Sequence, residues 1–164
     1  MDAHNFLIAA PNLADSAVLS GGNWVAPLAN LQTRPLKCVA RSASADPADT
    51  WFDVTLSRWS TIRALGLVAH NLTRAARVRL VAYQDAARTE VRWDSGWLPV
   101  WTRVWPTRAM DYRHPRWWSG LPADDELTGV TPTWIRTVSR ASAQYWRCHL
   151  ENPEPVEIGR LVMA

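Results

Sequence analysis

Short segments in which apolar and polar residues alternate constrain the fold of this chain more than any other feature. Successive side chains of a β-strand point to opposite faces of the sheet, so a period of two indicates a strand with one buried face. The alternating segments are residues 51–56, 76–83, 134–138, 145–150 and 156–162, with weaker examples at 36–40 and 90–93. Residues 62–69 form a nearly continuous apolar run, as expected for a central strand covered on both faces. The pattern therefore predicts about eight strands.

Residues typical of turns separate these segments. They are Gly21-Gly22, Asp46-Pro47, His70-Asn71 and Asn152-Pro153. We interpret His70 and Asn71 as turn residues that satisfy main-chain groups, in preference to ligand-binding residues. No stretch combines a 3.6-residue apolar period with a helix cap, which argues against a doubly wound α/β fold. The sequence predicts an all-β protein, an antiparallel β-sandwich with long irregular loops.

The alternation also predicts which side chains form the core. These are Phe52, Val54, Leu56, Ile62, Leu65, Leu67, Val78, Leu80, Ile135, Trp146, Leu150 and Ile158. In the same strands Arg77 and Arg79 are expected to point outward. Truncation of a buried Leu67 or Ile158 to Ala is expected to destabilise the fold by about 2–5 kcal/mol.

Two regions lack the alternation. Residues 1–35 are expected to form an N-terminal arm packed on the sandwich, and residues 36–164 the sandwich domain itself. Within that domain, a Trp- and Pro-rich excursion is predicted at about 94–133, with prolines at positions 99, 106, 115, 122 and 132. These prolines argue against a continuous helix. Loops of this length are uncommon and are usually functional or packed on something.

Tryptophan is unusually abundant, with 11 Trp against 3 Tyr and 2 Phe. One core of this size does not easily bury so many indoles, because each carries an N–H donor that requires a partner. We therefore expect some of them to line a contact surface. The candidate binding residues are Trp93, Trp97, Trp101, Trp105, Trp117 and Trp118.

The distribution of charge and apolar residues excludes several classes of partner. The net charge is +3, and the basic residues are spread from Arg34 to Arg160 with no block of five. Nucleic-acid-binding proteins usually cluster basic residues, so no nucleic-acid partner is expected. No run approaches the ~18 apolar residues of a membrane span, and the first residues lack the features of a signal peptide. The sequence predicts a protein made in a cytoplasm, without membrane insertion.

No motif indicates catalysis. The four histidines lie far apart, and no nucleophile–base or metal-ligand spacing is present. We therefore expect no enzymatic activity, no catalytic metal and no cofactor. Asp46, Asp49 and Asp53 leave open a calcium site built from carboxylate oxygens. The spacing of Cys38 and Cys148 leaves open whether they form a disulfide.

A longer series of residues resembles the opening half of a discoidin-like, galactose-binding-type jelly roll. The series is Asn30-Leu31-Gln32, Val39-Ala40-Arg41-Ser42, Trp51-Phe52-Asp53-Val54, and residues 62–72 ending in His70-Asn71-Leu72. The continuation is similar to tail proteins of tailed bacteriophages and prophages. It comprises residues 75–80, Asp94-Ser95-Gly96-Trp97, Tyr145-Trp146-Arg147 and Glu157-Ile158-Gly159-Arg160-Leu161, of which the last two are the most specific. The resemblance covers most of residues 5–162; Cys38 and Cys148 do not match the disulfide that often joins the two ends of discoidin modules.

The resemblance implies a structural component of a phage tail tip or baseplate. Its partners would be other tail proteins in an oligomeric assembly, with host attachment as an additional role, and its location the tail of the virion after synthesis in the host cytoplasm. The alternative is a carbohydrate-binding module that recognises a host-surface glycan, with Trp rings on sugar C–H faces and Arg, Asp and Asn on hydroxyls. Since interface cores favour Trp and Arg, the excursion is the expected contact region under the first hypothesis.

Overall fold

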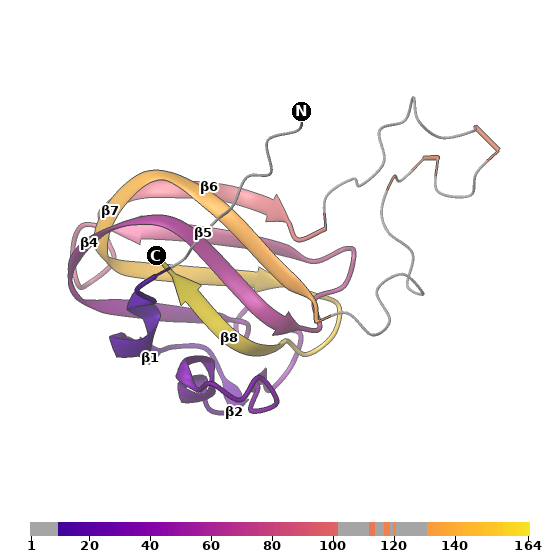
Figure 1. Ribbon diagram of the computed structural model, residues 1–164, viewed down its shortest axis with the longest axis horizontal. Helices are drawn as coiled ribbons and strands as arrows, with labels where there is room; N and C mark the ends of the chain where they lie inside the picture. Colours follow the sequence, from indigo (N-terminus) through magenta and orange to yellow (C-terminus); the bar gives the residue numbers. More distant parts are fainter. Residues whose placement is uncertain (1–9, 102–111, 114–116, 119, 121–130) are drawn as a thin grey trace.

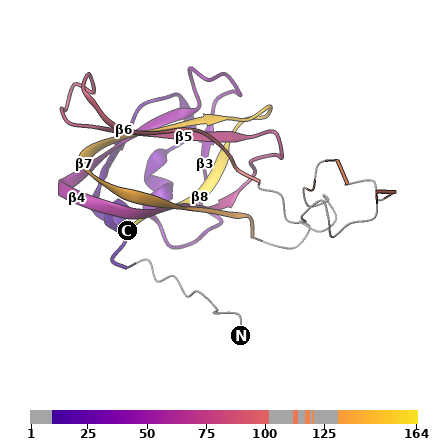
Figure 2. The ribbon, with the colours of Figure 1, turned by 90° about the horizontal axis from the view of Figure 1, so that it is seen from above.

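The chain folds into a β-sandwich with two layers of antiparallel strands (Figures 1 and 2). The computed structural model describes residues 10–101, 112–113, 117–118, 120 and 131–164, with the main chain alone for 138–140. The described strands are β1 (Val18–Ser20), β2 (Trp24–Ala26), β3 (Ala40–Ser42), β4 (Trp51–His70), β5 (Arg77–Tyr83), β6 (Val91–Pro99), β7 (Thr133–Glu151) and β8 (Glu157–Met163). The all-β class predicted from the alternation is confirmed.

Two long strands, β4 and β7, pass through both layers. They pair antiparallel along most of their length, from Trp51 opposite His149 to Val68 opposite Thr133. The register shifts just after Thr55, where the pairing is interrupted before it resumes. Such irregularities bend a strand and increase its twist, which carries both strands from one layer into the other.

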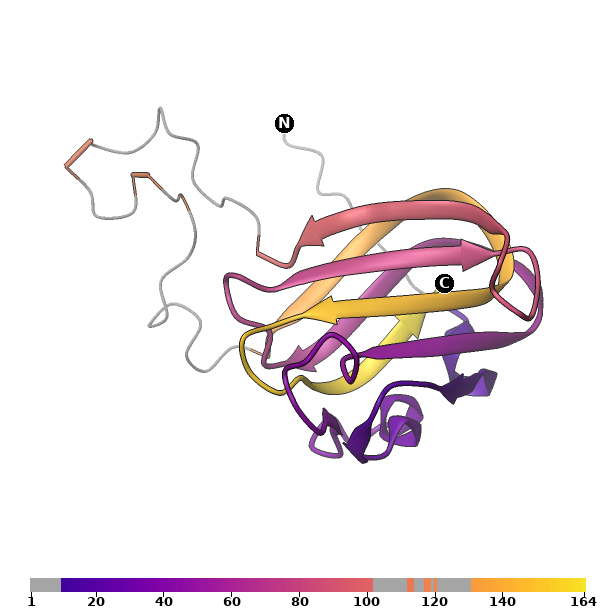
Figure 3. The ribbon, with the colours of Figure 1, turned by 180° about the vertical axis from the view of Figure 1, so that it is seen from behind.

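The halves of these strands divide between the layers. One layer has the order β1–β4–β7–β5–β6 and uses the first half of β4 with the second half of β7 (Figure 3). The other has the order β2–β3–β8–β4–β7 and uses the remaining halves. Because both layers share two strands, they enclose one core.

Four of the predicted strands are therefore halves of two longer ones. Residues 51–56 and 62–69 both belong to β4, and residues 134–138 and 145–150 both belong to β7. The alternation breaks in the middle of β4 because residues 57–59, at the bend, are exposed to solvent. Local periodicity separates these halves, whereas hydrogen bonding between β4 and β7 on either side of the bend joins them.

Eleven of the twelve predicted core residues are buried, and the exception is Ile135, which is 55% exposed. Trp134 takes the inward position opposite Leu67, so Ile135 points outward beside Gly66. The prediction for Ile135 was wrong because two adjacent apolar residues satisfy the same alternation with either face inward.

The segment before β3 closes one side of the sandwich (Figure 1). In it β1 pairs with β4 and β2 with β3, and two short 3-10 helices, η1 (Leu13–Ser16) and η2 (Leu28–Gln32), supply buried side chains. The Asn12 side chain fastens this segment to β8: it donates to the Leu161 carbonyl at 3.0 Å and accepts from the Met163 N–H at 2.8 Å. The division into an arm and a domain remains a prediction. Within the described part of the chain, no helix has the length and apolar character that crossing a bilayer requires.

Candidate functional site

The structure separates the tryptophans that were predicted to form one contact region. Trp93 and Trp97 lie in β6, so the excursion starts after Pro99 and not at about residue 94. Trp93 faces inward, with its ring centroid 6.1 Å from that of Trp146. Trp97 faces outward and is 37% exposed. Trp105 lies outside the described residues.

The remaining candidates have different surroundings. The Trp101 indole donates to the Leu72 carbonyl at 2.8 Å, and its ring centroid lies 5.8 Å from that of His70. Trp101 therefore packs against the turn after β4. Trp117 and Trp118 contact each other edge to face at 4.8 Å, and Trp118 is 80% exposed. Among the described candidates, Trp97 is the one that a β-strand holds on an outward face.

A β-bulge in β6 explains why Trp97 points outward together with Asp94. In a regular strand, residues three apart lie on opposite faces, but here both lie opposite β5 residues that share one face. Gly96 has φ +64°, a conformation that favours glycine. Its N–H donates to Asp94 Oδ1 at 2.9 Å, and the Ser95 hydroxyl accepts the Leu80 N–H at 2.9 Å. The bulge thus aims both side chains at the same surface.

We call this surface the Trp97 face. Its members are Arg77, Arg79, Asp94, Trp97, His149 and Glu151, from β5, β6 and the second half of β7. The Arg77 guanidinium carbon lies 5.5 Å from the centroid of the Trp97 ring, and the His149 ring lies 6.4 Å from it. Arg79 Nε donates to Asp94 Oδ1 at 3.1 Å, and Arg77 Nε donates to Glu151 Oε2 at 2.9 Å. The indole is therefore flanked by Arg77 and His149, and the two arginines of the face are each held by a carboxylate.

The charges on the Trp97 face follow from these contacts. The hydrogen bond from Arg79 is the main cause that lowers the pKa of Asp94, and it raises the pKa of Arg79 in turn. Burial is the main cause that lowers the pKa of His149, and the positive charges of Arg147 and Arg79 lower it further. At neutral pH the face thus presents charged Arg–carboxylate pairs beside a neutral imidazole, which both donates and accepts hydrogen bonds.

A buried ion-pair network lies next to the Trp97 face on the same layer. Asp53 accepts two hydrogen bonds from Arg147, at 2.7 and 3.1 Å, and Arg88 Nε lies 3.2 Å from its second oxygen. The Arg147 guanidinium carbon lies 4.3 Å from the ring centroid of Trp51. That ring also packs on Gly21, where a Cβ would approach it to 2.3 Å. Trp51 is therefore half-buried between Arg147 and Gly21, and this network supports the sheet.

Sequence reasoning found part of this site. It identified Trp97 and the outward direction of Arg77 and Arg79, but it missed Asp94 and His149. The partners in each pair are 15 or more positions apart along the chain, and the pairings depend on strand register. The pattern that could have indicated them is the series of polar or aromatic residues at every second position: Arg77 and Arg79 in one segment, and Tyr145, Arg147 and His149 in the other.

The open questions on metal and cysteine chemistry have structural answers. Asp53 is engaged by two arginines and does not join Asp46 and Asp49 in a calcium site. Across the described residues, no group of three His, Cys, Asp or Glu side chains is placed to hold a metal ion. Cys38 is exposed, Cys148 is buried, and both are free thiols. Burial raises the pKa of the Cys148 thiol, which keeps it protonated.

The fold is a galactose-binding-like jelly roll, and it is shared with discoidin-like carbohydrate-binding modules. In sequence, neither a protein-family profile nor a curated protein matches the chain.

Several solved structures match nearly the whole chain. The lectin domain of lectinolysin complexed with Lewis B antigen has a TM-score of 0.57 and 10% identity, covering 96% of this chain and 98% of that one. A Streptococcus pneumoniae fucose-binding module has a TM-score of 0.56 and 12% identity, covering 96% and 98%. Chitosan-binding module 1 of a chitosanase/glucanase from Paenibacillus sp. IK-5 has a TM-score of 0.56 and 14% identity, covering 93% and 98%. At these identities the likeness establishes a common fold.

Proposed function

We propose that this protein is a non-catalytic carbohydrate-binding module that holds its ligand on the Trp97 face. The observation that carries the proposal is the placement of a partly exposed indole, Trp97, beside the Arg79–Asp94 pair and the neutral ring of His149 on one sheet surface. A pyranose ring presents a C–H face and a rim of hydroxyls. The indole complements the first, and the paired polar groups complement the second.

Preorganisation makes this surface suited to binding. Each arginine is already held by a carboxylate, so a ligand orders few additional rotatable bonds. Side chains on strands are positioned more accurately than side chains on loops, and the bulge at Gly96 fixes the direction of Trp97. An ion pair also keeps donor and acceptor sites at its edges, which hydroxyl groups can use.

The solved structures support the same class of ligand. Their descriptions name the Lewis B antigen, fucose and chitosan, all of which are carbohydrates. Because the likeness extends to the fold alone, the choice of the Trp97 face rests on the geometry of this chain.

The proposal predicts that Trp97→Ala weakens glycan binding while the protein stays folded. Loss of a stacking indole at a binding hot spot costs about 2 kcal/mol or more, which corresponds to at least about a thirtyfold loss of affinity. A screen of neutral oligosaccharides identifies the ligand, and isothermal titration calorimetry then compares the variants.

The matched control is Trp118→Ala, which removes an indole that is 80% exposed in the excursion. It should bind the glycan as the unmodified protein does. Loss of binding in Trp118→Ala but not in Trp97→Ala would refute the Trp97 face as the site.

A role in a phage tail is a second candidate, and it is a proposal that depends on the sequence resemblance. The observation that favours it is the exposure of Tyr112 and Trp118, two large aromatic side chains in the excursion. Exposed aromatics of this kind are typical of interface anchors, and the protein would then be located in the tail of the virion. The same two variants test it: Trp118→Ala should impair incorporation into particles, whereas Trp97→Ala should leave incorporation unchanged.

A further inference from the structure

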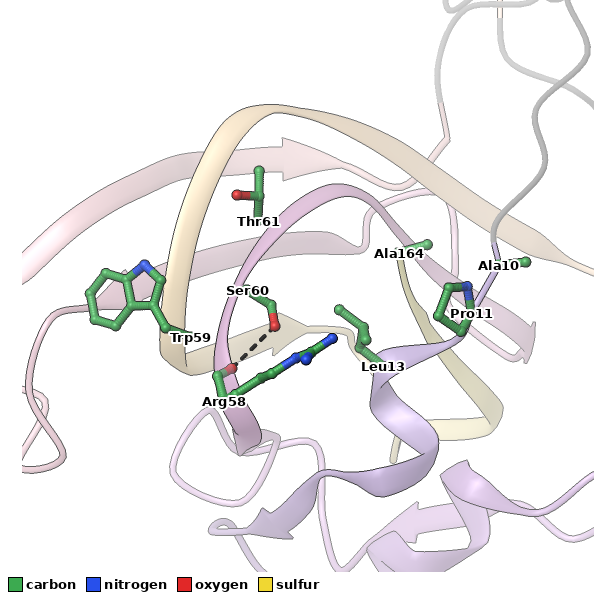
Figure 4. A pocket seen from close by; sticks show the side chains of 8 residues that line it. All are labelled: Ala10, Pro11, Leu13, Arg58, Trp59, Ser60, Thr61 and Ala164. Atoms are coloured by element: carbon green, nitrogen blue, oxygen red, sulfur yellow. Dashed lines mark hydrogen bonds between the residues drawn. The ribbon is translucent and has the colours of Figure 1, made fainter.

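A hollow of about 490 Å³ lies at the bend of β4, between that strand and the segment before β1 (Figure 4). It is separate from the Trp97 face and from the excursion. Its volume falls within the range of roughly 300–1,000 Å³ that is usual for small-molecule sites. Arg58, Trp59, Ser60 and Thr61 line it from β4, and Pro11 and Leu13 line it from the opposite side.

The irregular pairing at the bend makes these groups accessible. The β4–β7 register is interrupted between Thr55 and Ser60, so Arg58 and Trp59 lie where no β7 partner is paired with them. Arg58 extends across the hollow toward Leu13, and Trp59 stands at the other rim with 44% of its surface exposed (Figure 4). Bulges and similar irregularities of strand pairing are over-represented next to functional sites.

Arg58 supplies the charged side chain of the hollow. Arg58 forms no ion pair within the described part of the chain, and no Asp or Glu side chain lines the hollow. A second cation, Arg92, lies over the Trp59 ring at 5.1 Å from its centroid. Ala164 also lines the hollow, and its main-chain oxygen accepts the N–H groups of Arg63 and Ala64, at 2.7 and 2.8 Å. The Arg58 guanidinium is therefore available to pair with an anionic ligand.

The hollow also offers hydroxyl groups. The Ser60 hydroxyl lies 3.2 Å from the carbonyl oxygen of Arg58, and Thr61 Oγ1 lies 2.6 Å from Ser142 Oγ. Each hydroxyl has remaining hydrogen-bonding capacity, since a hydroxyl combines one donor with two acceptor positions. Pro11 and Leu13 supply an apolar wall on the other side.

We propose that this hollow is a second binding site, and that it takes a carboxylate-bearing sugar. The Arg58 guanidinium pairs with the carboxylate in a two-point contact, because its planar fork matches that geometry. Ser60 and Thr61 bind ring hydroxyls, and the C–H face of the ring rests against the apolar wall. The site is independent of the Trp97 face, whose arginines are each paired with a carboxylate.

Isothermal titration calorimetry on the full chain tests the proposal with two acidic probes, trigalacturonate and N-acetylneuraminic acid. At least one should bind, and its methyl ester, which keeps the ring but removes the charge, should bind at least about tenfold more weakly. Arg58→Gln should lower the affinity for the acid by at least about tenfold. Arg63→Gln is the matched control, because Arg63 is an exposed arginine of the same strand that does not line the hollow.

The outcomes separate this site from the proposed function. Trp97→Ala should bind the acidic probe normally, and Arg58→Gln should bind the neutral glycan normally. If neither acid binds, if the ester binds as well as the acid, or if Arg58→Gln and Arg63→Gln behave alike, the proposal is wrong. If the acid binds in an Arg58-dependent way while no neutral glycan binds, the second site stands and the proposed function of the Trp97 face fails.

Discussion

His70 shows how a single buried side chain couples stability to pH. It ends β4 with 4% of its surface exposed, and its Nδ1 accepts the Leu72 N–H at 3.2 Å, which confirms its interpretation as a turn residue. The Nε2 atom has no hydrogen-bond partner in the described part of the chain. Burial lowers the pKa of this imidazole from 6.5 to about 4, so the ring is neutral in the folded protein at neutral pH.

We predict that acidification destabilises the fold between about pH 6.5 and pH 4. In this window the unfolded chain binds a proton at His70 and the folded protein does not, so stability is complete above pH 6.5 and falls as pH decreases toward 4. A shift from 6.5 to about 4 corresponds to a loss of about 3 kcal/mol over the window. Urea denaturation at a series of pH values measures it.

The control is His70→Asn, whose side-chain oxygen is able to accept the Leu72 N–H without titrating. The dependence on pH should become markedly shallower in this variant. Part of it should remain, because burial also lowers the pKa of His149. An unchanged slope would show that protonation of His70 does not limit stability.

Among the strands, β6 shows that a single bulge determines which side chains lie on the Trp97 face. The sequence predicted a weak strand at residues 90–93 and placed Trp97 in the irregular excursion. In the structure Trp93 and Trp97 both lie in one strand, on opposite faces, because the bulge at Ser95–Gly96 inserts an extra residue between them.

We predict that Gly96→Ala disrupts the Trp97 face at a moderate cost in stability. Beyond the adjoining residues of the chain, no described atom lies within 4 Å of a Cβ placed at this position, so the effect comes from the backbone and not from a clash. Holding Ala at φ +64° costs roughly 1 kcal/mol. Relief of that strain would redirect Trp97 and weaken glycan binding. Denaturation and calorimetry measure the two effects, and Gly96→Asn, which tolerates this conformation better, should show smaller ones. Equal behaviour of both variants would contradict the role of the bulge.

At the scale of the whole molecule, the two layers are expected to unfold together, because β4 and β7 contribute to both. Leu67 and Ile135 test the assignment of inside and outside on these shared strands. Leu67→Ala removes a fully buried side chain and should cost about 2–5 kcal/mol. Ile135→Ala, on the outer face, should cost less than about 1 kcal/mol. Urea denaturation measures both changes. Similar losses of unfolding free energy in the two variants would contradict the assignment of Leu67 to the inner face and Ile135 to the outer face.

The amino-acid pattern alone predicts the all-β class, the sandwich and most of the core. Alternation along a strand records which face is buried, and Phe52, Leu67 and Leu80 each lie where it predicts. This information is local, because a period of two requires only the immediate neighbours. Trp97 was likewise identified from sequence as a candidate binding residue.

Contacts between distant segments determine which strands are continuous, which face Ile135 occupies and which polar groups surround Trp97. Each of these depends on register between segments far apart in the chain: Gly66 opposite Ile135, or Arg79 between His149 and Trp97. A shift of one residue in register moves every side chain to the other face, and hydrophobic alternation leaves that choice open where neighbouring residues are both apolar. The Trp97 face and the hollow at Arg58 both arise at irregularities in strand pairing. Such irregularities exist only between two paired strands, so the pattern of one segment does not predict them.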